Sequence, residues 1–332
     1  MPVAILGDRN CGKTVFLSLL YDTQIEYTNE TKQNFRYYAN PEFTRTMGKI
    51  VDGLMMGQWP DATLKGMLMK YWFLFGYRKK ILPTKYDTIK FTVYDIAGED
   101  VNIIDELISP YRNAGGTFEG ISYEDLPEGL KTLLDCNVLV FILDASRINE
   151  DPRSEAFESM LKYDTFMATL ISLVAEYKSK VIQATGQKLL LYPVFVFTKF
   201  DMVDPKILSA LKLESRPPSP TSRKNIEKRK EYAEKLMKHF YRKTLALKRG
   251  SILQLKNVCF DRSGYFFSYM ATELNEDGEP VPKIIPREAG GGVSYRLDYS
   301  INEYKAFIEY FRDIAKSMPD EVRDEQEFTT EK

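Results

Sequence analysis

The chain has 332 residues, 44% of them hydrophobic, and a net charge of −1 at pH 7 from 46 basic and 47 acidic side chains. This balance is typical of a soluble globular protein and argues against wholesale disorder and against a uniformly basic nucleic-acid-binding protein. The single histidine, His239, makes zinc-hydrolase and Ser-His-Asp chemistry poor candidates. Three widely spaced cysteines predict neither a disulfide framework nor a metal site, which favours a reducing compartment.

The chain contains no apolar run long enough to suggest a membrane span. The longest candidates, around Val138–Leu143 and Leu189–Phe197, fall well short of the roughly 18 residues that such a helix needs, and they are typical of buried strands. Met1–Leu6 leads directly into the first motif, so we expect no signal peptide and a cytoplasmic protein.

A glycine-rich loop over residues 7–14 is the first functional motif, placed between an apolar strand at Val3–Leu6 and an apolar helix. It matches the phosphate-binding pattern G-x-x-x-x-G-K-[ST]. Glycines allow close approach of the backbone, so that successive N–H groups can surround a phosphate. We expect Lys13 to contact the β- and γ-phosphates and Thr14 to bind Mg²⁺ at the start of the helix. The residues expected to contact a nucleotide here are Gly7, Asp8, Arg9, Asn10, Cys11, Gly12, Lys13, Thr14 and Val15.

The second motif runs from Asp95 to Gly98 and follows Ile89–Tyr94, where apolar and polar residues alternate as in a strand. A carboxylate at the end of that strand, beside the phosphate loop, can hold Mg²⁺ through water. The N–H of Gly98 can reach a γ-phosphate. The same four-residue pattern is common in turns, so its position after a strand and downstream of the phosphate loop gives it weight.

The third motif ends the apolar strand predicted over Leu189–Phe197 and contains Thr198, Lys199 and Asp201. The Asp201 carboxylate can accept hydrogen bonds from N1–H and from the exocyclic amine of guanine, a donor pair that adenine lacks. The aliphatic part of Lys199 can lie along the base. The alternative interpretation is a charged cap between a strand and a loop.

In this order the three motifs resemble the Ras-like branch of the P-loop GTPases. The resemblance implies GTP or GDP and Mg²⁺ as ligands, with phosphate, magnesium and guanine roles for Lys13, Asp95 and Asp201. The chain departs from the family at Thr198, where Asn is most frequent. A serine-containing loop after the family's last strand corresponds here to Ser268, after a strand predicted over Gly264–Phe267.

The resemblance also implies two switch regions. A threonine closes over Mg²⁺ and the γ-phosphate just before the strand predicted here over Met67–Tyr77, and Thr63 fits that position, with Thr84 as the alternative. A simple loop cap is the other interpretation of Thr63. Where the family usually has a glutamine that orients the catalytic water, this chain has Glu99. We therefore expect slow intrinsic hydrolysis, with Lys13, Thr63, Gly98 and Glu99 as catalytic residues and Thr14, Asp95 and Thr63 as metal ligands.

The source of a transition-state arginine is open at this stage. Arg9 lies inside the phosphate loop, although an exposed loop arginine is the simpler interpretation. Arg45 and Arg112 are further candidates, and a partner that supplies the arginine in trans is an equal alternative.

Strands and helices alternate along the chain, which predicts a doubly wound, mostly parallel α/β sheet with helices on both faces. In such folds the nucleotide lies at the carboxyl ends of the strands, where all three motifs fall. Amphipathic helices are predicted over 40–58, Glu155–Tyr177 and Tyr299–Ser317. We expect one domain over 1–317, with insertions at about 23–66, 101–134, 214–256 and 271–298, and an acidic tail over 318–332.

Two of these insertions carry further signals. Residues 223–249 hold 11 Lys and Arg against 3 Glu. They predict either a solvated helix face packed beside the guanine site or contact with an anionic partner, namely a membrane surface, an acidic protein or, less well supported, nucleic acid. Residues 271–298 are expected to form a hairpin and a mobile loop.

The leading hypothesis is a GTP-controlled molecular switch that hydrolyses GTP slowly and acts on an unidentified protein effector or activating partner. A non-catalytic nucleotide-binding scaffold is the first alternative. An ATPase or kinase of the wider P-loop class is the second.

Overall fold

The computed structural model describes residues 1–31, 34–61, 68–78, 86–96, 123–126, 128–187, 189–221, 225–250, 257–289 and 292–317. Thr63, Thr84, Gly98, Glu99, Arg112 and the tail 318–332 lie outside the described residues, and Asp95 is described by its backbone alone.

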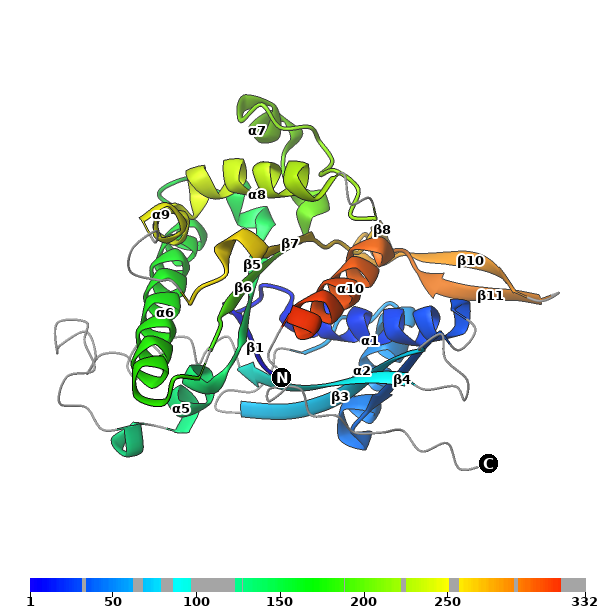
Figure 1. The fold of residues 1–332 in the computed structure, drawn as a ribbon. Helices are drawn as coiled ribbons and strands as arrows, with labels where there is room; N and C mark the ends of the chain where they lie inside the picture. Colours follow the sequence, from blue (N-terminus) through cyan, green and yellow to red (C-terminus); the bar gives the residue numbers. More distant parts are fainter. Residues whose placement is uncertain are drawn as a thin grey trace, which may run out of the picture.

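A curled seven-stranded sheet forms the centre of the molecule, with the strand order β2-β3-β4-β1-β5-β6-β7 (Figure 1). Neighbours are parallel from β4 through β1, β5 and β6 to β7, while β2, β3 and β4 are antiparallel to one another. The predicted α/β class is therefore confirmed. The strands are β1 (Pro2–Gly7), β2 (Phe35–Ala39), β3 (Leu68–Arg78), β4 (Tyr86–Ile96), β5 (Val138–Asp144), β6 (Tyr192–Thr198) and β7 (Gly264–Phe267).

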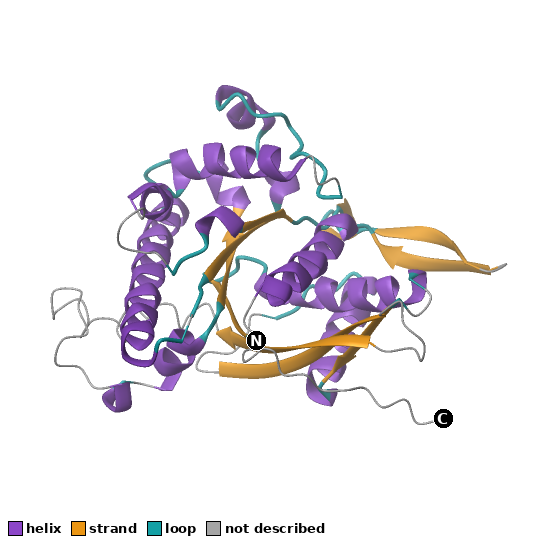
Figure 2. Cartoon of the chain, viewed as in Figure 1, coloured by secondary structure: helices purple, strands orange, loops and turns teal. Residues whose placement is uncertain are grey.

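Helices cover the two faces of this sheet (Figures 1 and 2). Alternate residues of β5 belong to two separate hydrophobic clusters. Val140 and the residues two positions before and after it face one side of the sheet, and Phe141 and the residues two positions before and after it face the other. Every β5 residue is buried, as expected of a strand that is covered on both faces, and all of its residues except the last, Asp144, are apolar. The helices on the Val140 side are α1 (Lys13–Glu30), α2 (Pro41–Met55) and α10 (Ile301–Ser317), and those on the Phe141 side include α5 (Glu128–Asp135), α6 (Glu155–Thr185), α8 (Ile226–Phe240) and α9 (Arg242–Gly250).

Two hairpins connect β7 to α10, where the sequence predicts one hairpin and a mobile loop. The first is β8 (Thr272–Leu274) with β9 (Pro280–Pro282), and the second is β10 (Ile284–Ala289) with β11 (Gly292–Leu297). The mobile loop is expected at the glycines 290–292, and residues 290 and 291 lie outside the described residues, so this expectation stays a prediction.

Other element boundaries differ modestly from the sequence predictions. The helix predicted over 40–58 ends at Met55, and the one predicted from Glu155 continues to Thr185, where Gly186 in a left-handed conformation ends it. The basic segment forms two helices rather than one, separated at the buried Tyr241. The edge strand β2 was not predicted. Short helical turns complete the described fold: η1 (Tyr123–Asp125), η2 (Ala145–Asn149), η3 (Phe200–Met202), α7 (Pro205–Ala210) and η5 (Phe260–Arg262).

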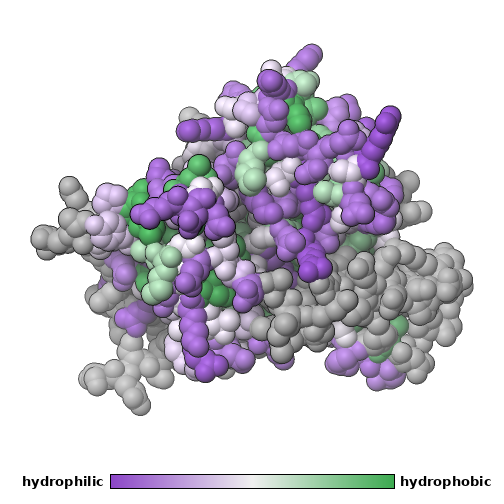
Figure 3. Space-filling model, turned by 180° about the vertical axis from the view of Figure 1, so that it is seen from behind, coloured by the Kyte–Doolittle hydropathy of each residue, from purple (hydrophilic) through white to green (hydrophobic). Residues whose placement is uncertain are grey.

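The surface is mainly hydrophilic on the face seen in Figure 3, with hydrophobic residues in small separate patches. None of the helices in the described ranges is long and apolar enough to cross a bilayer.

Candidate functional site

The phosphate-loop sequence connects β1 to α1 and adopts a backbone that only certain residues allow. Asn10 and Gly12 have φ values of 60° and 84°, in the left-handed region. A Cβ on Gly7 would overlap the Cys11 sulfur. The Cys11 N–H donates to the Asp8 carbonyl at 3.2 Å, closing a turn inside the loop. The two glycines of the motif therefore stand where the backbone requires them.

Helix α1 begins at Lys13, directly after the loop. Gly12 is its N-cap and supplies no side-chain hydrogen bond to the first turn. The first turn of a helix has N–H groups that no intrahelical carbonyl satisfies, and it carries the positive end of the helix dipole. Lys13 is only 5% exposed and adds a full positive charge there. This arrangement suits a bound anion.

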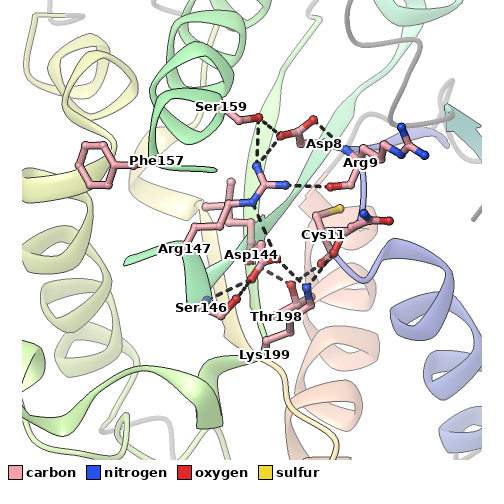
Figure 4. Close-up of polar contacts among 12 residues, drawn as sticks. Asp8, Arg9, Cys11, Asp144, Ser146, Arg147, Phe157, Ser159, Thr198 and Lys199 are labelled. Atoms are coloured by element: carbon pink, nitrogen blue, oxygen red, sulfur yellow. Dashed lines mark hydrogen bonds and ion pairs between the residues drawn. The ribbon is translucent and has the colours of Figure 1, made fainter. Parts of the chain in front are cut away.

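The third motif contacts the first. The Thr198 hydroxyl lies 2.5 Å from the Cys11 carbonyl oxygen and 3.1 Å from that of Leu143 (Figure 4). Lys199 Nζ donates to the Asn10 carbonyl at 2.8 Å. Two segments almost 190 residues apart in the chain are thus joined at the carboxyl ends of β1 and β6.

Asp201 lies three residues after the end of β6, in η3. Partial burial raises the pKa of its carboxyl group, while its own backbone N–H lowers it. Within the described ranges, no other residue forms a hydrogen bond or ion pair with this carboxylate. Its acceptor atoms are therefore available to a ligand.

Ser268 follows β7 and is joined to η3 through its backbone. Its N–H donates to Phe197 at 2.7 Å, and its carbonyl accepts from Phe200 at 3.2 Å. Its hydroxyl lies 2.6 Å from the Tyr304 hydroxyl of α10. The predicted contact of Ser268 with a base stays a prediction.

Only some of the residues predicted for the magnesium site and the switch regions lie in the described part of the structure. Asp95 is the backbone partner of Ile5 in the parallel pair β1–β4, so its Cα lies beside the strand that leads into the phosphate loop. Its role as a metal ligand stays a prediction, as do the roles of Thr63, Gly98 and Glu99. Arg45 is exposed on α2.

A charged network beside the loop was not predicted. Arg147, in η2, contacts the Asp8 carboxylate and donates to the Arg9 carbonyl at 2.8 Å. Asp144, at the end of β5, lies 3.8 Å from Arg147 and 2.7 Å from Lys199. The one sequence feature that could have pointed to this position is Asp144, a charged residue that ends an apolar run.

Cys11 is not a candidate nucleophile. Its side chain is buried, and burial raises the pKa of the thiol to about 11. The thiol is therefore protonated at neutral pH, and a thiol in that form is unreactive.

Part of the positive charge of 223–249 is neutralised inside the protein. Arg229 is buried and forms a bidentate pair with Glu303 at 3.0 and 2.6 Å, and Lys248 pairs with Glu234. These pairs favour the interpretation of this segment as packed helices over that of a free basic patch.

Neither a protein-family model nor a curated protein sequence matches this chain. Among solved structures, the chain is similar to the signal recognition particle receptor SRb-GTP/SRX complex from Chaetomium thermophilum. The TM-score is 0.30 and the identity 14%, over 63% of this chain and 76% of that one. A similarity of this size carries no functional conclusion.

Proposed function

We propose that this protein binds a guanine nucleotide together with Mg²⁺ and hydrolyses GTP slowly, as a nucleotide-controlled molecular switch. One observation carries the proposal: the left-handed phosphate loop is bonded directly to Thr198 and Lys199, and Asp201 follows with its carboxylate available. This arrangement supports phosphate and base recognition at one edge of the sheet, the edge where α/β folds bind ligands.

The phosphate groups would bind at the N-terminus of α1. Loop N–H groups and the Lys13 ammonium would stabilise the negative charge of the phosphates. This charge grows on the leaving oxygen when water attacks the γ-phosphorus and the bond to GDP breaks. Mg²⁺, held by Thr14, Asp95 and Thr63, would neutralise part of that charge. Glu99 in place of a glutamine supports a slow intrinsic rate.

Guanine selectivity would come from Asp201, and Lys199 would fix the position of the base. Lys199 is held by two acceptors, the Asn10 carbonyl and Asp144, so its stem is already ordered before a ligand binds. We propose that the whole of 1–317 serves as one nucleotide-binding domain whose insertions contact an effector or an activating partner.

Calorimetric titration with GDP, a non-hydrolysable GTP analogue and the matching ATP analogue tests the binding proposal. We expect guanine-selective, Mg²⁺-dependent binding that Lys13→Ala abolishes. Asp201→Asn should shift the preference toward xanthine nucleotides, whereas the matched control Asp204→Asn, at the N-cap of α7, should not. Equal or tighter binding of the ATP analogue would instead support the ATPase or kinase alternative.

Turnover separates a switch from a scaffold. We expect multiple-turnover release of phosphate from GTP that persists through purification and disappears in Lys13→Ala. The exposed Lys206→Ala serves as the control lysine and should retain turnover. Tight GDP binding without any turnover would leave the scaffold alternative standing.

A further inference from the structure

The phosphate loop contains a carboxylate, and a carboxylate repels phosphate. Asp8 directly follows Gly7, and its side chain is 20% exposed. One of its oxygens accepts from the Arg9 N–H at 2.7 Å; the other accepts from Ser159 at 2.5 Å and from Arg147. All of these donors belong to the protein, so the charge of Asp8 is balanced before any ligand arrives.

We propose that Arg147 is a positioning residue for nucleotide binding, which neutralises Asp8 and holds the loop with its N–H groups turned toward the phosphates. This inference rests on the proposed function. Arg147 comes from η2, directly after β5, and its guanidinium contacts both Asp8 and the Arg9 carbonyl (Figure 4). A planar guanidinium can serve two such acceptors at once.

Three successive loop carbonyls are bonded from outside the loop. Arg147 donates to the Arg9 carbonyl at 2.8 Å, Lys199 to the Asn10 carbonyl at 2.8 Å, and Thr198 to the Cys11 carbonyl at 2.5 Å. The C=O and N–H of a planar trans peptide point in opposite directions. The N–H groups of Asn10 and Gly12 therefore point away from these donors, which leaves them for an anion.

The charges alternate along the same contacts. Asp8 forms an ion pair with Arg147, Arg147 with Asp144, and Asp144 with Lys199. Two carboxylates thus balance two cations. Burial lowers the pKa of the Arg147 guanidinium, but the hydrogen bond and the charge of Asp8 raise it by more. The pKa is therefore raised overall, and the side chain stays a cation. Removal of Arg147 would leave Asp8 unbalanced beside the bound phosphates.

The test is a double-mutant cycle on GDP affinity by calorimetry. We expect Arg147→Met to weaken GDP binding by about tenfold or more. Asp8→Asn combined with Arg147→Met should recover part of the loss, because no unbalanced carboxylate remains. High salt should reduce the difference in GDP affinity between Arg147→Met and the wild type, because ions screen the repulsion between Asp8 and the phosphates. The exposed Arg153→Met is the matched control and should bind GDP like the wild type.

Two results would overturn the proposal: an Arg147→Met protein with wild-type affinity, or a double variant as weak as Arg147→Met alone. If Arg147→Met does not fold, Arg147→Lys carries the test. It keeps the charge but replaces the two guanidinium nitrogens, one on Asp8 and one on the Arg9 carbonyl, by a single nitrogen on a shorter side chain. Its affinity should therefore fall, and wild-type affinity would contradict us. A wild-type protein that binds no GDP refutes the proposed function as well, whereas normal binding that is insensitive to Arg147 refutes this inference alone.

Discussion

The Thr198 hydroxyl donates to the carbonyl oxygen of Cys11 across 2.5 Å, although 187 positions separate the two residues in the chain. Thr198 is only 5% exposed, and Cys11 only 2%. The end of β6 and the phosphate loop therefore form one unit, in which a buried donor meets a buried carbonyl.

Replacing Thr198 by Val tests this link. Valine has nearly the same shape but no donor, so the Cys11 carbonyl would stay buried without its side-chain partner. We expect a loss of about 1–3 kcal/mol in the free energy of unfolding. Urea denaturation without nucleotide measures it. Thr198→Ser keeps the hydroxyl and should lose clearly less; equal stabilities of Thr198→Val and the wild type would show that the bond contributes nothing.

The edge of the sheet at β7 gives a second prediction. Arg229 donates to the Tyr265 carbonyl at 3.0 Å, and Glu303 accepts from the Phe267 N–H at 3.0 Å, so the buried pair Arg229–Glu303 satisfies edge groups of β7. Glu303→Gln would leave a buried guanidinium without its counter-charge. We expect a loss of about 3–5 kcal/mol in the free energy of unfolding.

The pair Glu158–Lys162 is the matched control for this prediction. Its side chains are 62% and 74% exposed, and its N–O distance is 2.8 Å. Glu158→Gln should leave the free energy of unfolding nearly unchanged, since exposed pairs of this spacing contribute little. Similar losses from Glu303→Gln and Glu158→Gln in thermal or urea unfolding would contradict the prediction.

Local patterns explain which parts of the fold were predictable. The continuous apolar run at β5 and the glycine spacing of the loop are properties of neighbouring residues. The buried strand is confirmed, and phosphate binding by the loop stays a prediction. The strand β2 was missed because Phe35–Ala39 is short and its burial follows from pairing with β3, a distant segment. Periodicity likewise gave no sign of the break at Tyr241, where the chain leaves α8 to bury an aromatic ring.

The candidate site likewise has a part that was predictable from the sequence and a part that was not. Lys13, Thr198 and Asp201 belong to motifs that a sequence displays directly. The bonds of Arg147 to Asp8 and to Arg9 join segments 139 and 138 positions apart, and nothing in the sequence around residue 147 specifies that partner. Side-chain networks of this kind depend on the packing of several elements at once, so the structure is needed to find them.

Cysteine reactivity provides a third prediction. Burial raises the pKa of Cys11 to about 11 and that of Cys136 to about 12, whereas Cys259 is only partly buried. At pH 8 we expect iodoacetamide to modify Cys259 first. Cys11 should react about two orders of magnitude more slowly than a free thiol, because so little thiolate is present. Mass spectrometry of the digested protein assigns the sites, and Cys259→Ser should leave the folded protein nearly unlabelled. Rapid labelling of Cys11 would contradict the burial of its thiol.

The last prediction concerns Lys178, which is 2% exposed on α6. Burial lowers the pKa of its ammonium to about 8, against the opposing effect of Cys136 and Asp135. Between about pH 8 and the ordinary lysine pKa, the unfolded chain binds more protons at this position than the folded one. The contribution of Lys178 to the free energy of unfolding therefore rises with pH through that window. Below pH 8 the full cost of its burial applies.

Lys178→Met removes this cost while filling a similar volume. At pH 7 we expect the variant to be more stable than the wild type, by up to about 3 kcal/mol, and the advantage to shrink as the pH rises from 8 toward 10.5. Buried thiols have the opposite effect above pH 9, where they make the free energy of unfolding fall as the pH rises. Both proteins share this effect, so the difference in free energy of unfolding between variant and wild type is measured by urea denaturation at each pH. Lys180→Met, two positions along α6 and 44% exposed, is the control and should show a small, pH-independent change. An advantage of Lys178→Met that stays constant from pH 7 to pH 10 would show that Lys178 does not titrate in this window.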